Sequence, residues 1–234
     1  MSPIAANLQA VRRRISEALQ GDRRAITLVA VSKWQPLAAL RAARDAGCRD
    51  FGESYVQEAL PKIAGMGDRD IQWHFIGHLQ GNKARDVARH FDWVHGVDRA
   101  SIAAALALAR PESAAALNVC LQVNISQEAT KGGVAPGEVE ALARAVLALP
   151  RLKLRGLMGM AGAGLAPAAQ RAQFATLRRA YGELAARGIA LDTLSMGMSH
   201  DFESALAEGA TMLRIGTAIF GERPAAAPTS GNGA

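Results

Sequence analysis

The 234-residue sequence predicts an α/β fold, a single-domain (β/α)8 barrel preceded by one extra helix. Three observations predict it. Short apolar segments rich in β-branched residues alternate with amphipathic segments along the chain. Eight such strand segments follow one another without an interior linker. The rival, a doubly wound open sheet, would place a glycine-rich dinucleotide loop after its first strand, and the sequence has none there.

The extra helix lies at the N-terminus. Its apolar side chains recur at three- and four-residue steps: Ile4, Leu8, Val11, Ile15 and Leu19. The run Arg12-Arg13-Arg14, with no acidic residue before Glu17, faintly resembles a transit peptide. The apolar stripe instead favours an amphipathic helix docked on the core, so we expect a structural helix and a cytoplasmic protein.

The remaining elements alternate in chain order. The strand segments are 25–33, 49–53, 71–77, 92–97, 117–124, 152–158, 191–195 and 211–216. The helical segments lie near 36–47, 54–65, 81–90, 99–110, 136–149, 167–188 and 199–209. Pro36, Pro167 and Ser199 stand at helix starts, and Gly47 follows a helix end. We therefore expect one barrel over 1–223 and, because it is rich in Ala, Pro, Gly and Ser, a disordered tail over 224–234.

Composition narrows the classes of function. No apolar stretch of about 18 residues lacks charges or breakers, which argues against a transmembrane span. The two cysteines, Cys48 and Cys120, are too few for a disulfide framework and lack metal-ligand spacing. The net charge of +6 comes from scattered arginines without interleaved aromatic residues. We therefore expect a solvated basic surface, with no nucleic-acid or membrane partner.

Lys33 closes the first predicted strand and is the strongest candidate for chemistry. The chain has 27 Lys and Arg residues, of which only 5 are lysines, so a lysine at this strand end is unusual. A desolvated lysine can become a neutral amine and form an imine with a carbonyl, whereas arginine keeps its proton. The alternative is a lysine whose stem covers apolar surface at a strand end.

Two loops at the carboxyl ends of the last strands predict a phosphate site. The segment 195–199, Ser-Met-Gly-Met-Ser, leads into a helix, and Gly216-Thr217 follows the eighth strand. Barrels bind phosphate near strands seven and eight, where small residues let backbone N–H groups approach an anion. Ser199 as a simple helix N-cap is the alternative.

Arg214 lies within the eighth strand. If Leu213 and Ile215 face the helices, Arg214 faces the barrel interior near its mouth. A buried arginine needs a partner, either a carboxylate such as Glu203 or an acceptor on a ligand.

Other polar residues near strand ends have simpler explanations. His74 and His78 are four residues apart but lie in a strand-to-loop segment without a third ligand, so we expect no metal site. Ser54 lacks a nucleophile elbow, and Glu53 is equally an acid, a base or a helix-start carboxylate.

Five segments, in order, resemble the pyridoxal phosphate homeostasis proteins, a family of pyridoxal-phosphate-binding proteins. They are LVAVSK (28–33), FGESYVQE (51–58), WHFIGHLQGNK (73–83), SMGMS (195–199) and MLRIGTAIFG (212–221). The resemblance spans residues 4 to about 223 and implies a barrel related to the N-terminal domain of alanine racemase, the fold of type III pyridoxal phosphate enzymes.

The resemblance also implies roles for individual residues. Lys33 would carry pyridoxal 5′-phosphate as an aldimine, and Arg214 would face the pyridine nitrogen. The phosphate would be held by Ser199, Gly216 and Thr217, and the ring pocket would be lined by Met196, His78 and Ser54. The family usually has asparagine at Ser54 and serine at Gly81. The first departure would shorten a hydrogen bond beside the ring or make it water-mediated.

An arginine at the pyridine nitrogen keeps that nitrogen unprotonated, because two cations would otherwise be juxtaposed. The ring is then a weak electron sink, which disfavours broad carbanion chemistry. Racemisation also needs a second acid or base, in alanine racemases a tyrosine from a separate β-domain of the partner subunit. This sequence offers only Tyr55 and Tyr181 and, as we expect, no appended domain.

We therefore expect a monomer that binds, buffers and delivers pyridoxal phosphate, with pyridoxal-phosphate-dependent apoenzymes as recipients and no defined turnover. One alternative is a low-activity racemase-like enzyme of the same fold type. A second is an aldolase or sugar-phosphate isomerase that forms a Schiff base without the cofactor. A third is a purely regulatory binding module.

Overall fold

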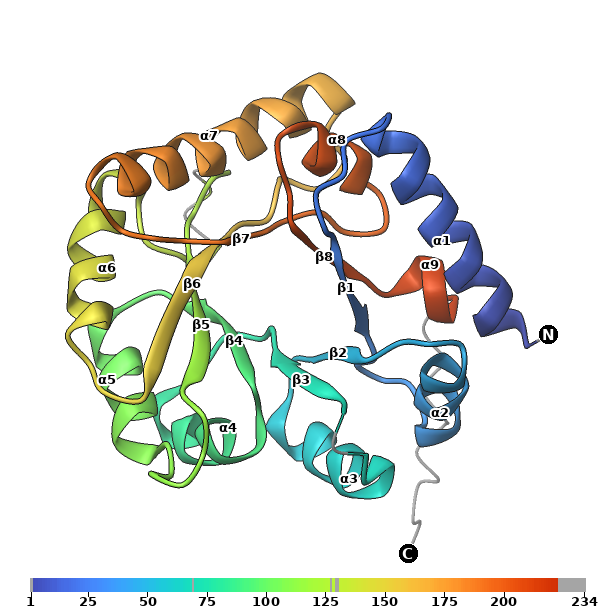
Figure 1. Ribbon diagram of the computed structural model, residues 1–234, viewed down its shortest axis with the longest axis horizontal. Coiled ribbons are helices and arrows are strands. Elements are labelled where there is room, and N and C mark those ends of the chain that lie inside the picture. Colours follow the sequence, from blue (N-terminus) through green and yellow to red (C-terminus); the bar gives the residue numbers. More distant parts are fainter. Residues whose placement is uncertain (1, 69, 127, 129–130, 223–234) are drawn as a thin grey trace, which may run out of the picture.

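The computed structural model describes residues 2–68, 70–126, 128 and 131–222, and its centre is a closed parallel barrel (Figure 1). The eight strands pair in chain order, and β1 closes the barrel against β8. The strands are β1 Thr27–Val31, β2 Asp50–Glu53, β3 Gln72–Phe75, β4 Trp93–Val97, β5 Leu117–Gln122, β6 Leu152–Met158, β7 Thr193–Ser195 and β8 Met212–Ile215. The predicted (β/α)8 barrel is confirmed, and each strand lies within or close to its predicted segment.

Helices surround the barrel (Figure 1). They are α1 Pro3–Leu19, α2 Leu37–Asp45, α3 Val56–Met66, α4 Ala84–His90, α5 Ala100–Ala109, α6 Val139–Leu147, α7 Pro167–Ala186, α8 Phe202–Ala207 and α9 Thr217–Phe220. Two short 3₁₀ turns, Gly81–Lys83 and Pro136–Glu138, precede α4 and α6. The short helix α9 was not predicted, since four residues carry too little periodicity to reveal it. The predicted tail, 224–234, lies outside the described residues.

The N-terminal helix α1 packs on the outside of the barrel as predicted. Leu8, Val11 and Ile15 are buried against the core, which accounts for the apolar stripe. The side chain of Asn7 donates to the carbonyl of Ile219 at 2.9 Å and so links α1 to α9. The two helices lie side by side next to β1 (Figure 1). This contact supports the loop that follows β8. Across the described residues, no helix combines the length and the apolar character needed to cross a bilayer.

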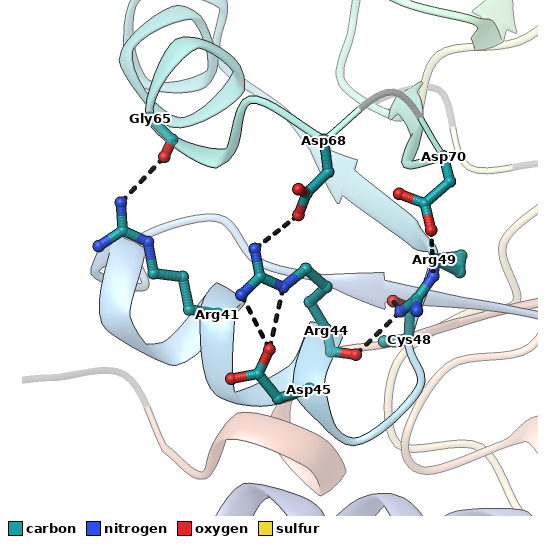
Figure 2. Close-up of polar contacts among 8 residues, drawn as sticks. All are labelled: Arg41, Arg44, Asp45, Cys48, Arg49, Gly65, Asp68 and Asp70. Atoms are coloured by element: carbon teal, nitrogen blue, oxygen red, sulfur yellow. Dashed lines mark hydrogen bonds and ion pairs between the residues drawn. The ribbon is translucent and has the colours of Figure 1, made fainter.

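Many of the arginines take part in surface contacts within the chain. Figure 2 shows one such group between α2 and α3. Arg41 donates to the carbonyl of Gly65 at 3.0 Å, and Arg44 pairs with Asp68 at 2.5 Å. Arg49 pairs with an aspartate in the loop before β3, again at the surface. Exposed pairs of this kind contribute little to stability, so they shape the basic surface more than they stabilise the fold.

The barrel has two apolar regions. The larger lies between the strands and the surrounding helices and contains Leu213 and Ile215, both fully buried. A small cluster lies apart from it: Val29, Trp93, Cys120, Met158 and Met212. Because side chains alternate along a strand, Arg214 points the other way from Leu213 and Ile215, as predicted. The remaining interior is polar, and this polar interior forms the candidate site.

Candidate functional site

Lys33 lies in a tight turn directly after β1. The N–H of Gln35 donates to the carbonyl of Ser32 at 3.0 Å, which closes the turn. Trp34 sits at a positive φ of 62°, a conformation that a bulky residue adopts only where its surroundings hold it. Lys33 is half-buried as a residue, and its ammonium lies 4.8 Å from the centre of the Trp34 ring. The turn therefore presents the lysine at the carboxyl end of the barrel.

A buried ion cluster behind this turn holds it in place. The ammonium of Lys62, from α3, donates to the carbonyl of Ser32 at 2.7 Å. It also donates to the carboxylates of Glu53 at 2.8 Å and Glu58 at 2.6 Å. Glu58 in turn accepts the backbone N–H of Trp34. All three protons of one lysine are thus used to tie α3 and β2 to the turn that carries Lys33.

Glu53 belongs to this cluster and lies at the end of β2, not at the start of a helix. Its side chain is fully buried and accepts the hydroxyl of Ser32 at 2.6 Å. Burial raises the pKa of Glu53, although the hydrogen bonds from Lys62 and Ser32 act in the opposite direction. Lys62 was missed in the sequence. Its spacing of four residues from Glu58, in a chain with few lysines, was the available signal.

Arg214 faces the barrel interior and is almost fully buried. It donates to the hydroxyl of Ser195 at 2.7 Å and to the carbonyl of Gly159 at 3.2 Å. Glu203, one of the partners considered for it, instead pairs with Arg14 at the surface, because it lies on α8 outside the barrel. Burial among neutral partners lowers the pKa of Arg214 to about 10, and Asp201 offsets part of this effect.

Behind Ser195 lies a line of buried imidazoles that the sequence did not reveal. The hydroxyl of Ser195 is 2.8 Å from Nδ1 of His95, and Nε2 of His95 is 3.0 Å from Nδ1 of His74. Nε2 of His74 is 3.0 Å from a carboxylate oxygen of Asp50. His74 is therefore a hydrogen-bond partner of His95 and Asp50 inside the barrel. Among the described residues, no group of three or more His, Cys, Asp or Glu side chains is arranged to hold a metal ion.

The loops after β7 and β8 come together beside Lys33. The hydroxyl of Ser199 accepts the N–H of Ala218 at 3.2 Å, which joins the two loops. Gly197 sits at a φ of 96°, and a Cβ there would lie 2.8 Å from that of Ala205, so the close turn requires glycine. A small cavity of about 90 Å³ is lined by Lys33 together with Gly216 and Thr217.

A wider pocket of about 520 Å³ opens on the other side of Lys33. Ser54, Tyr55, His78 and Lys83 also line it. The structure therefore brings Ser54 and His78 to the predicted lysine. His78 is largely exposed, with Nδ1 at 3.7 Å from a carboxylate oxygen of a neighbouring aspartate.

Met196 is placed differently from the other predicted site residues. It is fully buried within the main hydrophobic core, next to β7. Its proposed contact with a ring in the pocket stays a prediction.

Comparisons with known proteins identify the family of this chain. The family model for the alanine racemase N-terminal domain matches residues 2–224. The chain is 53% identical to a Pseudomonas aeruginosa protein named pyridoxal phosphate homeostasis protein, over 98% of this chain and 100% of that one. It is 49% identical to the Escherichia coli protein of the same name, over 95% of this chain and 98% of that one.

Solved structures show the same fold. PipY of Synechococcus elongatus, with pyridoxal phosphate bound, is 40% identical with a TM-score of 0.82, covering 93% of this chain and all of PipY. Alanine racemase from Corynebacterium glutamicum is 19% identical with a TM-score of 0.71, covering 96% of this chain and 61% of the racemase, which shows a shared fold alone. The chain belongs to the pyridoxal phosphate homeostasis protein family, on the barrel of the alanine racemase N-terminal domain.

Proposed function

We propose that the chain binds pyridoxal 5′-phosphate covalently at Lys33 and serves cytoplasmic vitamin B6 homeostasis by buffering or delivering this cofactor, without defined catalytic turnover. One observation carries the proposal: Lys33 lines a single cavity with Gly216 and Thr217, and Ser199 is hydrogen-bonded to the next residue of that loop, Ala218, so an amine and the proposed phosphate site are neighbours. The names of the relatives and the cofactor bound in PipY support the same ligand.

The donors and acceptors of the site fit this cofactor. Ser199 and Thr217 supply hydroxyls, and Gly216 allows the backbone to approach an anion closely. Arg214, one strand from Lys33, would face the pyridine nitrogen, while Ser54 and His78 would border the ring from the wider pocket. We assign Met196 to the same ring pocket.

The chemistry suits a reversible carrier. The neutral amine of Lys33 adds to the aldehyde of the cofactor, and loss of one water leaves the aldimine. Attack by a second amine reverses this bond, so the protein can sequester a reactive aldehyde and still release it. A guanidinium beside the pyridine nitrogen disfavours a proton there, which weakens the ring as an electron sink.

Removal of the phosphate contacts is expected to weaken retention of the cofactor more than loss of Arg214. Charged hydrogen bonds contribute about 1.5–3 kcal/mol each, so the double variant Ser199→Ala, Thr217→Val loses more than Arg214→Ala. We expect a rise in Kd on the order of 100-fold for the double variant and about tenfold for Arg214→Ala. Fluorescence titration with pyridoxal phosphate measures both, and equal losses would refute the ranking.

Delivery can be separated from simple release. If the loaded protein hands the cofactor to an apoenzyme in a complex, the transfer rate rises with apoenzyme concentration. If the cofactor merely dissociates, the rate saturates at the off-rate measured with a small-molecule amine trap. A pyridoxal-phosphate-dependent apoenzyme with a chromogenic assay serves as the recipient. Saturation at the off-rate would reduce the role to buffering.

We also propose that the chain acts as a monomer, because Lys33, both phosphate loops and Arg214 all come from one chain. Light scattering at micromolar concentration is expected to give the mass of one chain, 24.6 kDa. A dimeric mass would overturn this part of the proposal.

One observation favours a second function, a low-activity racemase-like enzyme. Tyr55 lines the same pocket as Lys33 and is half-exposed, so a phenol is available near the amine. Tyr181 is excluded from this role because its hydroxyl donates to the carbonyl of Leu191 on the outer layer. The enzyme predicts exchange of the α-hydrogen of an amino acid with D₂O, lost in Tyr55→Phe. A carrier shows no exchange above the background from pyridoxal phosphate alone.

A further inference from the structure

The barrel interior holds one continuous chain of hydrogen bonds that ends on Arg214. It runs from Asp50 at the start of β2, through His74 of β3 and His95 of β4, to Ser195 of β7. Each link measures 2.7–3.0 Å, including that from Ser195 to Arg214. The side chains of His74, His95 and Ser195 are fully buried, so water does not compete for these groups.

The carboxylate at the other end determines the direction of every link when both rings are neutral. A carboxylate only accepts, so His74 carries its proton on Nε2 and donates to Asp50, and its bare Nδ1 accepts from Nε2–H of His95. Nδ1 of His95 is then bare and accepts the hydroxyl proton of Ser195. The oxygen of Ser195 accepts from Arg214, because a guanidinium only donates. Burial is the largest cause, and the positive charge of Arg214 a smaller one, by which the pKa of His95 lies well below its usual value, which agrees with a neutral ring.

The two ends of this line of hydrogen bonds, Asp50 and Arg214, differ in their access to solvent. The side chain of Asp50 is 26% exposed and lines a pocket of about 430 Å³ with Arg12 and Arg49, at the end of β2 opposite the site. Stacking against Trp93, with ring centres 5.4 Å apart and planes 13° apart, orients the His74 ring. A partly exposed carboxylate thus polarises a line of hydrogen-bonded groups that leads to a buried guanidinium.

We infer that Ser195, His95 and His74 are positioning residues for Arg214, and that they orient its guanidinium without neutralising it. A carboxylate in the place of Ser195 would hold the arginine but cancel its charge. A polarised hydroxyl holds it and leaves the positive charge to act on the group that Arg214 faces. The identity of that group as the pyridine nitrogen rests on the proposed function, whereas the direction of the chain does not.

The donor-to-acceptor direction of these hydrogen bonds can be measured without any cofactor. In ¹⁵N-histidine NMR of the unliganded protein near neutral pH, His74 and His95 are expected to show a protonated Nε2 and a bare Nδ1. His74→Gln and His95→Asn assign the two sets of signals by their loss. A proton on Nδ1 of His95, or a charged His95, would reverse or break the chain and overturn the inference.

The positioning role is tested by Ser195→Ala, with Cys120→Ala as the matched control. Both changes remove one buried side-chain atom from the barrel strands. Cys120, however, takes no part in the line of hydrogen bonds from Asp50 to Arg214. We expect the slowly exchanging guanidinium N–H signals of Arg214 to disappear in Ser195→Ala and to persist in Cys120→Ala. Ser195→Thr, which keeps the hydroxyl, is expected to restore them. Equal behaviour of the two alanine variants would overturn the role.

The same variants test whether Ser195 influences the binding of pyridoxal phosphate. With pyridoxal phosphate bound, Ser195→Ala is expected to raise Kd about tenfold and to shift the pH profile of the visible absorption band, which Cys120→Ala leaves in place. A profile unmoved by Ser195→Ala would remove the link to the pyridine nitrogen. If the wild type binds no pyridoxal phosphate at all, the proposed function fails, and the two NMR measurements still decide the positioning role.

Discussion

Replacement of Lys33 by alanine is expected to abolish covalent capture of pyridoxal phosphate. The wild-type protein should show a visible absorption band that borohydride bleaches, and mass spectrometry should then locate the reduced cofactor on Lys33. In Lys33→Ala no lysine remains at the end of β1, so the band and the adduct disappear. Because an imine and its burial are lost together, we expect Kd to rise on the order of 100-fold or more.

Lys83→Ala is the matched control, since Lys83 lines the same pocket. This variant should keep both the band and the adduct on Lys33. A reduced adduct found on Lys83 in the wild type, or any adduct that survives in Lys33→Ala, would contradict the assignment of Lys33 as the amine that binds the cofactor. No band in the wild type, even with added pyridoxal phosphate, would remove the cofactor from the proposal and revive a barrel enzyme that forms a Schiff base with its own substrate.

Replacement of Lys62 by methionine is expected to lower the free energy of unfolding by about 3–5 kcal/mol. The change removes the only cation paired with the fully buried Glu53 among the described residues, and it also releases the carbonyl of Ser32. Urea unfolding followed by circular dichroism measures the loss. An exposed pair gives the control: Arg144→Met breaks the surface pair with Glu140 and should lose about 0–1 kcal/mol.

The pH dependence of this variant has a defined sign. The pKa of Glu53 is already raised by burial, and loss of Lys62 raises it further. A group whose pKa is higher in the folded state stabilises the fold at low pH, and this stability is lost as the pH rises through the folded pKa. We therefore expect Lys62→Met to be less destabilising in mild acid than at neutral pH. A second change, Glu53→Gln, should restore part of the loss, and an unchanged stability in Lys62→Met would refute the role of the cluster.

Several parts of the site could be predicted from the sequence because their signals are local. The end of an apolar strand places Lys33, and two runs of small and hydroxyl residues place Ser199 and Thr217. In a parallel barrel the carboxyl ends of all strands meet on one face, so residues far apart in sequence converge without any knowledge of side-chain packing. The inward direction of Arg214 followed in the same way from alternation along its strand.

The partners of these residues could not be predicted in the same way. Glu203 was a reasonable carboxylate for Arg214 from its nearness in sequence, but the barrel turns Arg214 inward while α8 carries Glu203 outside. Ser195 became the partner because β7 pairs with β8 and both side chains point into the barrel. Lys62 was overlooked because one lysine within a helix resembles any surface residue until the helix packs behind the turn.

By itself the sequence determined the barrel and placed Lys33 and the loops of Ser199 and Thr217 at the carboxyl ends of its strands, because periodicity, strand ends and glycine turns depend on neighbouring residues. Only the tertiary structure decided which groups share protons: the line of Asp50, His74, His95 and Ser195, and the cluster around Lys62. Each of those contacts joins different strands or a strand and a helix. Hydrogen bonds of about 3 Å depend on register and closure, which no local pattern specifies.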